Sequence, residues 1–363
     1  MRTLAKNSIE MVVQRDIVAI SIPFTAGVAL AACLPSGGDA PYWAAAGSSL
    51  AATALLVPDA GRRRIATLFP FLFLCLGIFC HCSATISVPL RPRSGAGRAL
   101  EGLLRAIDGA EFPHRSTAAL LKALLAGQRD GLDRDTIAVF RAAGASHILA
   151  LSGLHLGILY GILHGAMAWM GRSRGATLVR SLIQVGFAGT YVVMTGGSPS
   201  LVRAFLFILL NELSRLLPGR RRRPLNIFCA ALTIQLSLRP DVITSLGFQL
   251  SYLAMLGIVL VFPRLDAWFP GGRFNPLRRI WSAVALTCSC QLFTAPLVWI
   301  RFRSFPKYFL LTNLGALPLT ELFILSSLPV LILGGHCPEG IKKLADILGQ
   351  FLLQFLGTVA SIP

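Results

Sequence analysis

Residues 308–334 read YFLLTNLGALPLTELFILSSLPVLILG, and Glu321 is the single charged residue among them. A helix needs about 20 predominantly apolar residues to cross a bilayer, so this stretch is long enough to do so. Segment 199–217 carries three charged residues and is otherwise apolar, and another apolar run follows Asp346. Further runs without Asp, Glu, Lys or Arg lie at 17–34, 42–57, 65–90, 146–171, 181–202, 224–238, 242–263 and 280–300. We therefore expect an all-α, polytopic integral membrane protein with roughly 9–12 transmembrane helices.

The composition points to the same class. Of the 363 residues, 54% are hydrophobic and 14% are charged, whereas an average soluble domain carries about 25% charged residues. The mean hydropathy is +0.67. Too few charges are present to cover two soluble domains, and disordered or coiled-coil chains are excluded for the same reason.

The basic residues predict an orientation. Cytoplasmic loops of membrane proteins collect Lys and Arg, and the short loops hold eighteen such residues on one side and four on the other. We therefore expect a multi-pass membrane protein with its N-terminus in the cytoplasm. The eighteen residues are Arg2, Lys6, Arg15, Arg62–Arg64, Arg172, Arg174, Arg220–Arg223, Arg264, Arg273, Arg278, Arg279, Lys342 and Lys343.

The expected spans divide the chain into three segments. Residues 1–90 should form about three N-terminal transmembrane helices, and 146–363 the remaining membrane domain. The polar segment 91–145 between them should lie on the outer face, although it is basic. Its apolar residues recur at helical spacing, so we expect two short amphipathic helices at the membrane interface. This segment is either a solvated basic surface or a docking surface for an anion.

Four glycines follow one another at intervals of four residues: Gly153, Gly157, Gly161 and Gly165. Such a stripe of small residues lets another helix approach closely, so we expect a packing face. The same glycines weaken the helix, which allows a break near Ser152 and Gly153.

A helix start is predicted at Ser198-Pro199-Ser200, because Ser suits the cap and Pro the first helical position. The positive end of this helix favours an anion, and Arg203 lies one turn inside. The alternative is a simple cap, with Arg203 extending its charge toward the lipid headgroups.

Other polar residues inside the expected spans suggest a lined passage, or hydrogen bonds between helices. Glu212 can pair with Arg215, three residues away, which would give both a structural role. The sequence has no phosphate-binding GxxxxGK[ST] loop and no HExxH, and Ser152 and His155 have no third carboxylate. We expect no enzyme, no cofactor and no metal, since Cys80-His81-Cys82 lacks a second ligand pair.

Several short motifs lie between roughly 120 and 320. They are LAGQR at 125–129, GASHILALSGLH at 144–155, SLVRA at 200–204, Pro240 with GFQLS at 247–251, and QLFTAPL at 291–297. In content and order these motifs resemble the competence domain of ComEC-type DNA-uptake proteins, whose pattern Gly, Ser-His, Ala-x-Ser-Gly-x-His is matched at 144–155.

This resemblance implies an inner-membrane channel subunit for single-stranded transforming DNA. The outer mouth would consist of the basic segment 91–145 with Ser198, Ser200 and Arg203, and the deeper path would be lined by His147, Ser152, His155, Gln249 and Ser251. The implied partners are single-stranded DNA, membrane lipid, a separate outer DNA receptor and a cytoplasmic helicase-like motor, with a homo-oligomer also open.

The chain departs from longer family members in two respects. The segment 91–145 is too short to hold an oligonucleotide-binding (OB) fold as well as two helices, and no His-x-His-x-Asp-His cluster follows residue 320. The OB-fold and the metallo-β-lactamase-like domain of those members are therefore not expected here. The alternative function is a transporter or flippase for a smaller anion on the same helical core.

Overall fold

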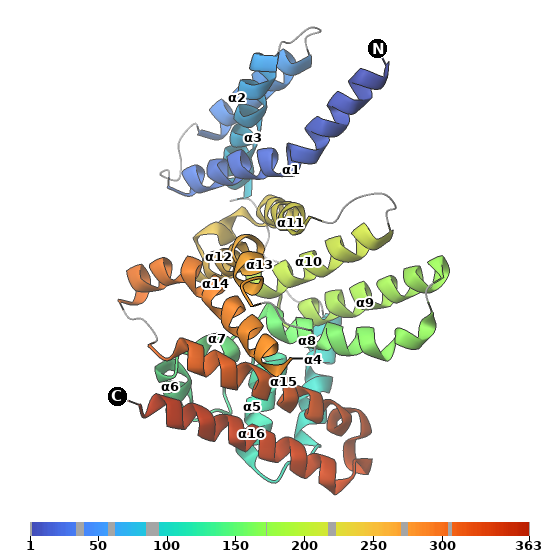
Figure 1. Ribbon diagram of the computed structural model, residues 1–363, viewed down its shortest axis with the longest axis vertical. Coiled ribbons are helices and arrows are strands. Elements are labelled where there is room, and N and C mark those ends of the chain that lie inside the picture. The colour runs from blue at the N-terminus through green and yellow to red at the C-terminus, as the bar shows by residue number, and fades with distance from the viewer. Residues whose placement is uncertain are drawn as a thin grey trace. The chain divides into compact units, whose positions relative to one another are not determined.

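The computed structural model describes residues 2–33, 40–56, 62–84, 94–171, 173–216, 223–269, 275–303 and 307–362. Within these ranges every regular element is a helix and no strand is present (Figure 1). The expected all-α class is therefore confirmed.

The chain divides into two compact units. Unit 1 comprises Met1–Leu90 and Leu209–Tyr252, and unit 2 comprises Arg91–Ile208 and Leu253–Pro363. The first division coincides with the expected start of the polar segment at residue 91. Unit 1 also takes in residues 209–252, which lie within the segment expected to continue from 146 to 363.

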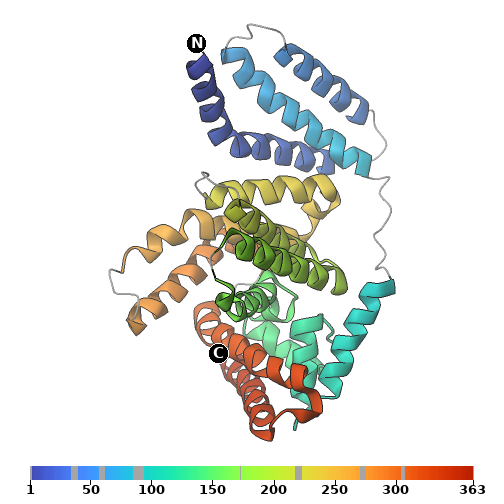
Figure 2. The same ribbon diagram turned by 90° about the vertical axis from the view of Figure 1, so that its right-hand side faces the viewer.

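Unit 1 is formed around its first three helices, which lie side by side (Figure 2). Ser21 on α1 donates a hydrogen bond to the Cys229 carbonyl at 3.0 Å, which joins α1 to α11. Tyr252 donates to Gln235 Oε1 at 2.9 Å inside the same unit. The elements are α1 (Arg2–Cys33), α2 (Ala40–Leu56), α3 (Arg62–Ala84), α11 (Pro224–Leu238) and η2 (Pro240–Thr244).

Unit 2 holds most of the remaining helices. In chain order they are α4 (Ser94–Asp108), α5 (Arg115–Ala126), α6 (Arg134–Ala142), α7 (Ser146–Leu149), α8 (Gly153–Ala166), η1 (Ala168–Met170), α9 (Arg174–Met194), α13 (Phe262–Asp266), α14 (Pro276–Phe302), α15 (Phe309–Leu333), η3 (Gly334–His336) and α16 (Glu339–Ala360). Two helices continue from one unit into the other, namely α10 (Pro199–Leu216) and α12 (Leu246–Leu260).

Helix α5 lies in the core of unit 2. Leu120, Leu121 and Leu124 are fully buried, and eight of its twelve residues are buried in all. An amphipathic helix at a membrane interface would keep a polar face exposed. The structure instead encloses α5 between other helices, because its apolar residues extend around more than one face.

The turn between α4 and α5 packs against the turn between α15 and α16. Ala110 is fully buried in a cluster with Val330, Cys337 and Ala345. The charge count predicts that Lys342 and Lys343 lie on the cytoplasmic side, whereas all of 91–145 was expected outside. These two expectations cannot both be correct, because the two turns are in contact and therefore lie on the same side of the membrane.

Three stretches of the described chain are long and apolar enough to cross a membrane: α9, α14, and Phe309–His336, which contains α15. Shorter apolar helices lie at Ile17–Cys33, Leu68–Ser83, Pro224–Leu238 and Leu246–Leu260. The run 146–171 is not one continuous helix, since α7 ends at Leu149 and α8 begins at Gly153. The break expected near Ser152 and Gly153 is confirmed.

Candidate functional site: the junction of two helix N-termini

Helix α8 begins with a capping box. The Ser152 hydroxyl accepts a hydrogen bond from the Leu154 backbone N–H at 3.3 Å. His155 Nδ1 accepts from the Ser152 backbone N–H at 3.4 Å. Both side chains therefore satisfy backbone donors at the start of α8.

Helix α10 begins beside it, at Pro199 as predicted. The Ser198 hydroxyl accepts from the Leu201 backbone N–H at 3.4 Å and caps the helix. The same hydroxyl lies 3.5 Å from the Leu151 carbonyl, to which it donates. Since Leu151 directly precedes the cap of α8, Ser198 joins the two helix starts.

Gly153 permits the close approach of the two helices. A Cβ at this position would lie 3.0 Å from the Ala204 Cβ, 3.4 Å from Arg203 Nη2 and 3.8 Å from the Ser200 carbonyl oxygen. Arg203 and Ser200 of α10 therefore flank the first residue of α8. We call Ser152, His155, Ser198, Ser200 and Arg203 the α8–α10 junction.

The α8–α10 junction concentrates positive potential. Each helix N-terminus carries a partial positive charge of about half a unit, and the guanidinium of Arg203 adds a full one. Arg203 is 9% exposed, and its Nε and Nη1 are shielded from solvent. Positive charge at a buried helix start favours an anion, because the low local dielectric strengthens each interaction.

His155, which belongs to this junction, contributes a further hydrogen-bond donor. Its side chain is fully buried, and its Nε2 atom has no hydrogen-bond partner among the described residues. Because Nδ1 accepts from Ser152, the neutral ring carries its proton on Nε2.

The remaining predicted site residues lie outside the junction as defined above. His147, on the one-turn helix α7, lies close enough to His155 for the two side chains to interact electrostatically. Gln249 and Ser251 belong to unit 1, where Gln249 Nε2 donates to the Ile243 carbonyl at 2.8 Å. The structure therefore places six of the eight predicted path residues in or beside the junction. The predicted pair of Glu212 and Arg215 is confirmed at 2.7 Å.

The glycine stripe of α8 was expected to form a packing face against another helix, and most of it does not. Only Gly153 is in close contact with another helix, and a Cβ at Gly157, Gly161 or Gly165 would meet nothing within 4 Å. Gly153, Gly157 and Gly161 instead line a groove of about 510 Å³, with Glu321 and Leu325 of α15 on its other side.

The sequence LAGQR at 125–129 has contacts that sequence reasoning missed. Arg129 donates from Nε and Nη2 to the Leu149 carbonyl, at 3.2 and 3.0 Å. The Tyr191 hydroxyl donates to the Leu125 carbonyl at 2.8 Å. Arg129 was counted among the basic residues of 91–145, and its place in a family motif was the signal that set it apart.

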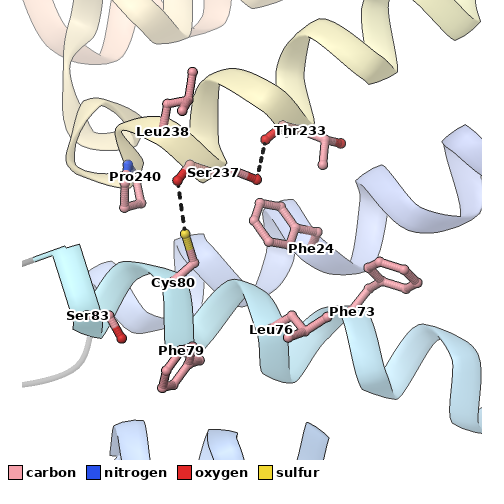
Figure 3. A pocket seen from close by; sticks show the side chains of 10 residues that line it. All are labelled: Phe24, Phe73, Leu76, Phe79, Cys80, Ser83, Thr233, Ser237, Leu238 and Pro240. Carbon is pink, nitrogen blue, oxygen red and sulfur yellow. Dashed lines mark hydrogen bonds between the residues drawn. The ribbon is translucent and has the colours of Figure 1, made fainter. Parts of the chain in front are cut away.

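Unit 1 contains a second hollow, of about 520 Å³, between α1, α3 and α11 (Figure 3). Phe24, Phe73 and Phe79 line it, and the Cys80 thiol at one end donates to the Ser237 carbonyl at 3.4 Å. Its ten lining residues include no charged side chain, so it offers no counter-charge to an anion. Among the described residues, no three His, Cys, Asp or Glu side chains are grouped so as to hold a metal ion.

The fold defines an all-helical membrane protein in which two helix starts and Arg203 are grouped at the α8–α10 junction. Residues 124–363 match the competence protein family. Because this match covers more than half of the chain, the chain belongs to that family.

Two curated relatives support the assignment. ComE operon protein 3 of Bacillus subtilis (strain 168) is 31% identical over 149 residues, which is 41% of this chain and 19% of that protein. Recombination protein 2 of Haemophilus influenzae is 29% identical over 217 residues, which is 56% of this chain and 27% of that protein. The chain thus spans about a fifth to a quarter of these relatives. No solved structure matches the chain.

Proposed function

We propose that this chain is a subunit of an inner-membrane conduit that admits single-stranded DNA to the cytoplasm. Membership of the competence protein family supports a role in DNA uptake. The observation that carries the proposal is the meeting of two helix N-termini with Arg203 in the α8–α10 junction.

The chemistry of the junction suits a nucleic-acid backbone. A single strand carries one negative charge per nucleotide, and its path must replace the water and counterions around each phosphate. The positive ends of the two helices attract the phosphate, and the guanidinium offers a planar, two-pronged contact. The Nε2 proton of His155 provides one more donor.

Further parts of the path follow from the same proposal. His147, Gln249 and Ser251 would line its deeper section, and basic residues of 91–145 would attract the strand at the outer mouth. The described residues present no motor, so pulling would fall to a separate cytoplasmic helicase-like partner. Capture of the strand would fall to an outer DNA receptor.

Replacement of Arg203 tests this proposal. Arg203→Gln removes a charged hydrogen-bond donor, which is worth about 1.5–3 kcal/mol, so uptake of labelled DNA into the cytoplasm should fall about tenfold or more. Arg203→Lys keeps the charge but loses the two-pronged geometry, so it should retain part of the activity. Arg203→Glu reverses the local charge and should abolish uptake.

Two comparisons make the result decisive. Arg239→Gln removes the same charge from an exposed ion pair with Asp241, where such pairs contribute little, and it should leave uptake unchanged. All values are normalised to the amount of protein in the membrane. Parental uptake in Arg203→Gln would remove the junction from the path. Parental uptake after deletion of the gene would instead favour transport of a smaller anion.

A further inference from the structure

The short segment between α7 and α8 determines where α8 begins. Helix α7 has only four residues, so its last carbonyls have no partner within the helix. One of them, the Leu149 carbonyl, accepts two hydrogen bonds from the Arg129 guanidinium, at 3.0 and 3.2 Å. Arg129 therefore caps the C-terminus of α7 from the loop that follows α5.

The other end of this segment, at Leu151, is also fixed by a hydrogen bond. The Leu151 carbonyl accepts from Ser198 at the start of α10, and Ser152 follows as the cap of α8. Three residues, 149–151, thus connect the contact with Arg129 to the α8–α10 junction. A shift at Leu149 would be transmitted to the N-terminus of α8, because so short a segment has little freedom to absorb it.

Other contacts hold the loop after α5, which carries Arg129, in place. The loop that carries it leaves α5 at Gly127, and the preceding Leu125 carbonyl is held by the buried Tyr191 hydroxyl. Gly127 adopts a left-handed conformation with φ +73°. A side chain there would overlap the terminal methyl of Leu151, so the loop also contacts the segment before α8 directly.

We infer that Arg129 is a positioning residue for the α8–α10 junction, acting through the Leu149 carbonyl to set the start of α8 against Arg203. This inference rests on the proposed function of that junction. Arg129 is exposed and basic, which would otherwise suggest an independent phosphate contact. The two roles predict different behaviour when Arg129 and Arg203 are changed together.

The test is a double-mutant cycle on DNA uptake by the full chain. Arg129→Gln and Arg203→Gln should each lower uptake about tenfold, as the loss of a charged hydrogen bond predicts. The double variant should be no worse than Arg203→Gln alone, because the site that Arg129 positions is already lost. Two independent phosphate contacts would instead give a loss of about a hundredfold.

A matched control separates positioning from a general loss of stability. Tyr252→Phe removes the buried hydrogen bond to Gln235 in unit 1, and any loss of uptake that it causes should multiply with that of Arg203→Gln. Arg129→Lys retains one donor for Leu149 and should recover part of the uptake lost in Arg129→Gln. Repeating the cycle with Lys at both positions covers the case in which Arg129→Gln fails to accumulate.

The outcomes distinguish this inference from the proposed function. Multiplying effects of Arg129→Gln and Arg203→Gln, or parental uptake in Arg129→Gln, would overturn the positioning role and leave the junction in place. Parental uptake in Arg203→Gln would overturn the junction itself, and the positioning role with it.

Discussion

Gly127 shows how a single residue fixes the chain path below the α8–α10 junction. It follows the last residue of α5 in a left-handed conformation, and its backbone N–H is bonded to the preceding turn. Glycine adopts this conformation without strain because it has no Cβ. A second requirement is spatial, since the Leu151 side chain occupies the place of a Cβ.

We predict that Gly127→Ala destabilises the protein more than Gly196→Ala. Gly196 also has a positive φ, +81°, but nothing lies within 4 Å of its missing Cβ. Both changes incur the strain of a side chain at positive φ, about 1–2 kcal/mol. Only Gly127→Ala also forces the terminal methyl of Leu151 to move, which adds a smaller cost because a side-chain end can rotate aside. Thermal unfolding of the purified protein in detergent measures the difference, and equal midpoints would contradict the expected overlap.

Some residue contacts could be predicted from the sequence and others could not. The cap at Ser198, the start at Pro199 and the pair of Glu212 with Arg215 lie within one helical turn, where spacing alone fixes proximity. The partner of Arg129 lies twenty residues away in the chain. No local rule predicts such a contact.

At the scale of helices, backbones approach closely at Gly27 and Gly77, whereas in the α8 stripe only Gly153 contacts another helix. A Cβ at Gly27 of α1 would overlap the Leu74 carbonyl oxygen of α3. A Cβ at Gly77 of α3 would overlap the Phe24 carbonyl oxygen of α1. The two glycines therefore form a reciprocal contact that lets α1 and α3 approach closely.

We predict that Gly77→Ala weakens the packing of α1 on α3, whereas Gly157→Ala has little effect. A carbonyl oxygen of a helix cannot move aside as a side-chain end can, so the helices must separate, at a cost of about 1–3 kcal/mol. Gly157 has no neighbour within 4 Å. Resistance to thermal unfolding should fall for Gly77→Ala only. An equal fall for Gly157→Ala would show that its face is covered.

At the scale of the whole molecule, the contact between two turns decides which parts share a side of the membrane. The His114 backbone N–H donates to Asp346 Oδ1 at 3.2 Å, and Thr117 donates to the same oxygen at 2.6 Å. Asp346 is almost fully buried. The start of α5 and the first turns of α16 must therefore lie at the same level of the membrane.

We predict that Glu111→Cys and Glu339→Cys react with a membrane-impermeant thiol reagent from the same side. Both positions are exposed and flank this contact. The charge rule predicts the cytoplasmic side, because Lys342 and Lys343 follow Glu339. Cys33, the only native cysteine that is exposed among the described residues, is replaced by Ser beforehand. Labelling of the two positions from opposite sides would contradict the packing of α5 on α16.

The sequence by itself determined the all-helical membrane class, the family, the break before α8 and the helix start at Ser198-Pro199. These features depend on composition, on a motif and on residues within one turn of each other, which the linear order contains. Only the tertiary structure decided that α5 is buried, that Gly27 and Gly77 pack closely while Gly157, Gly161 and Gly165 do not, and that Arg129 caps α7. Each of these depends on which surfaces meet, and that is set by the packing of helices far apart in the chain.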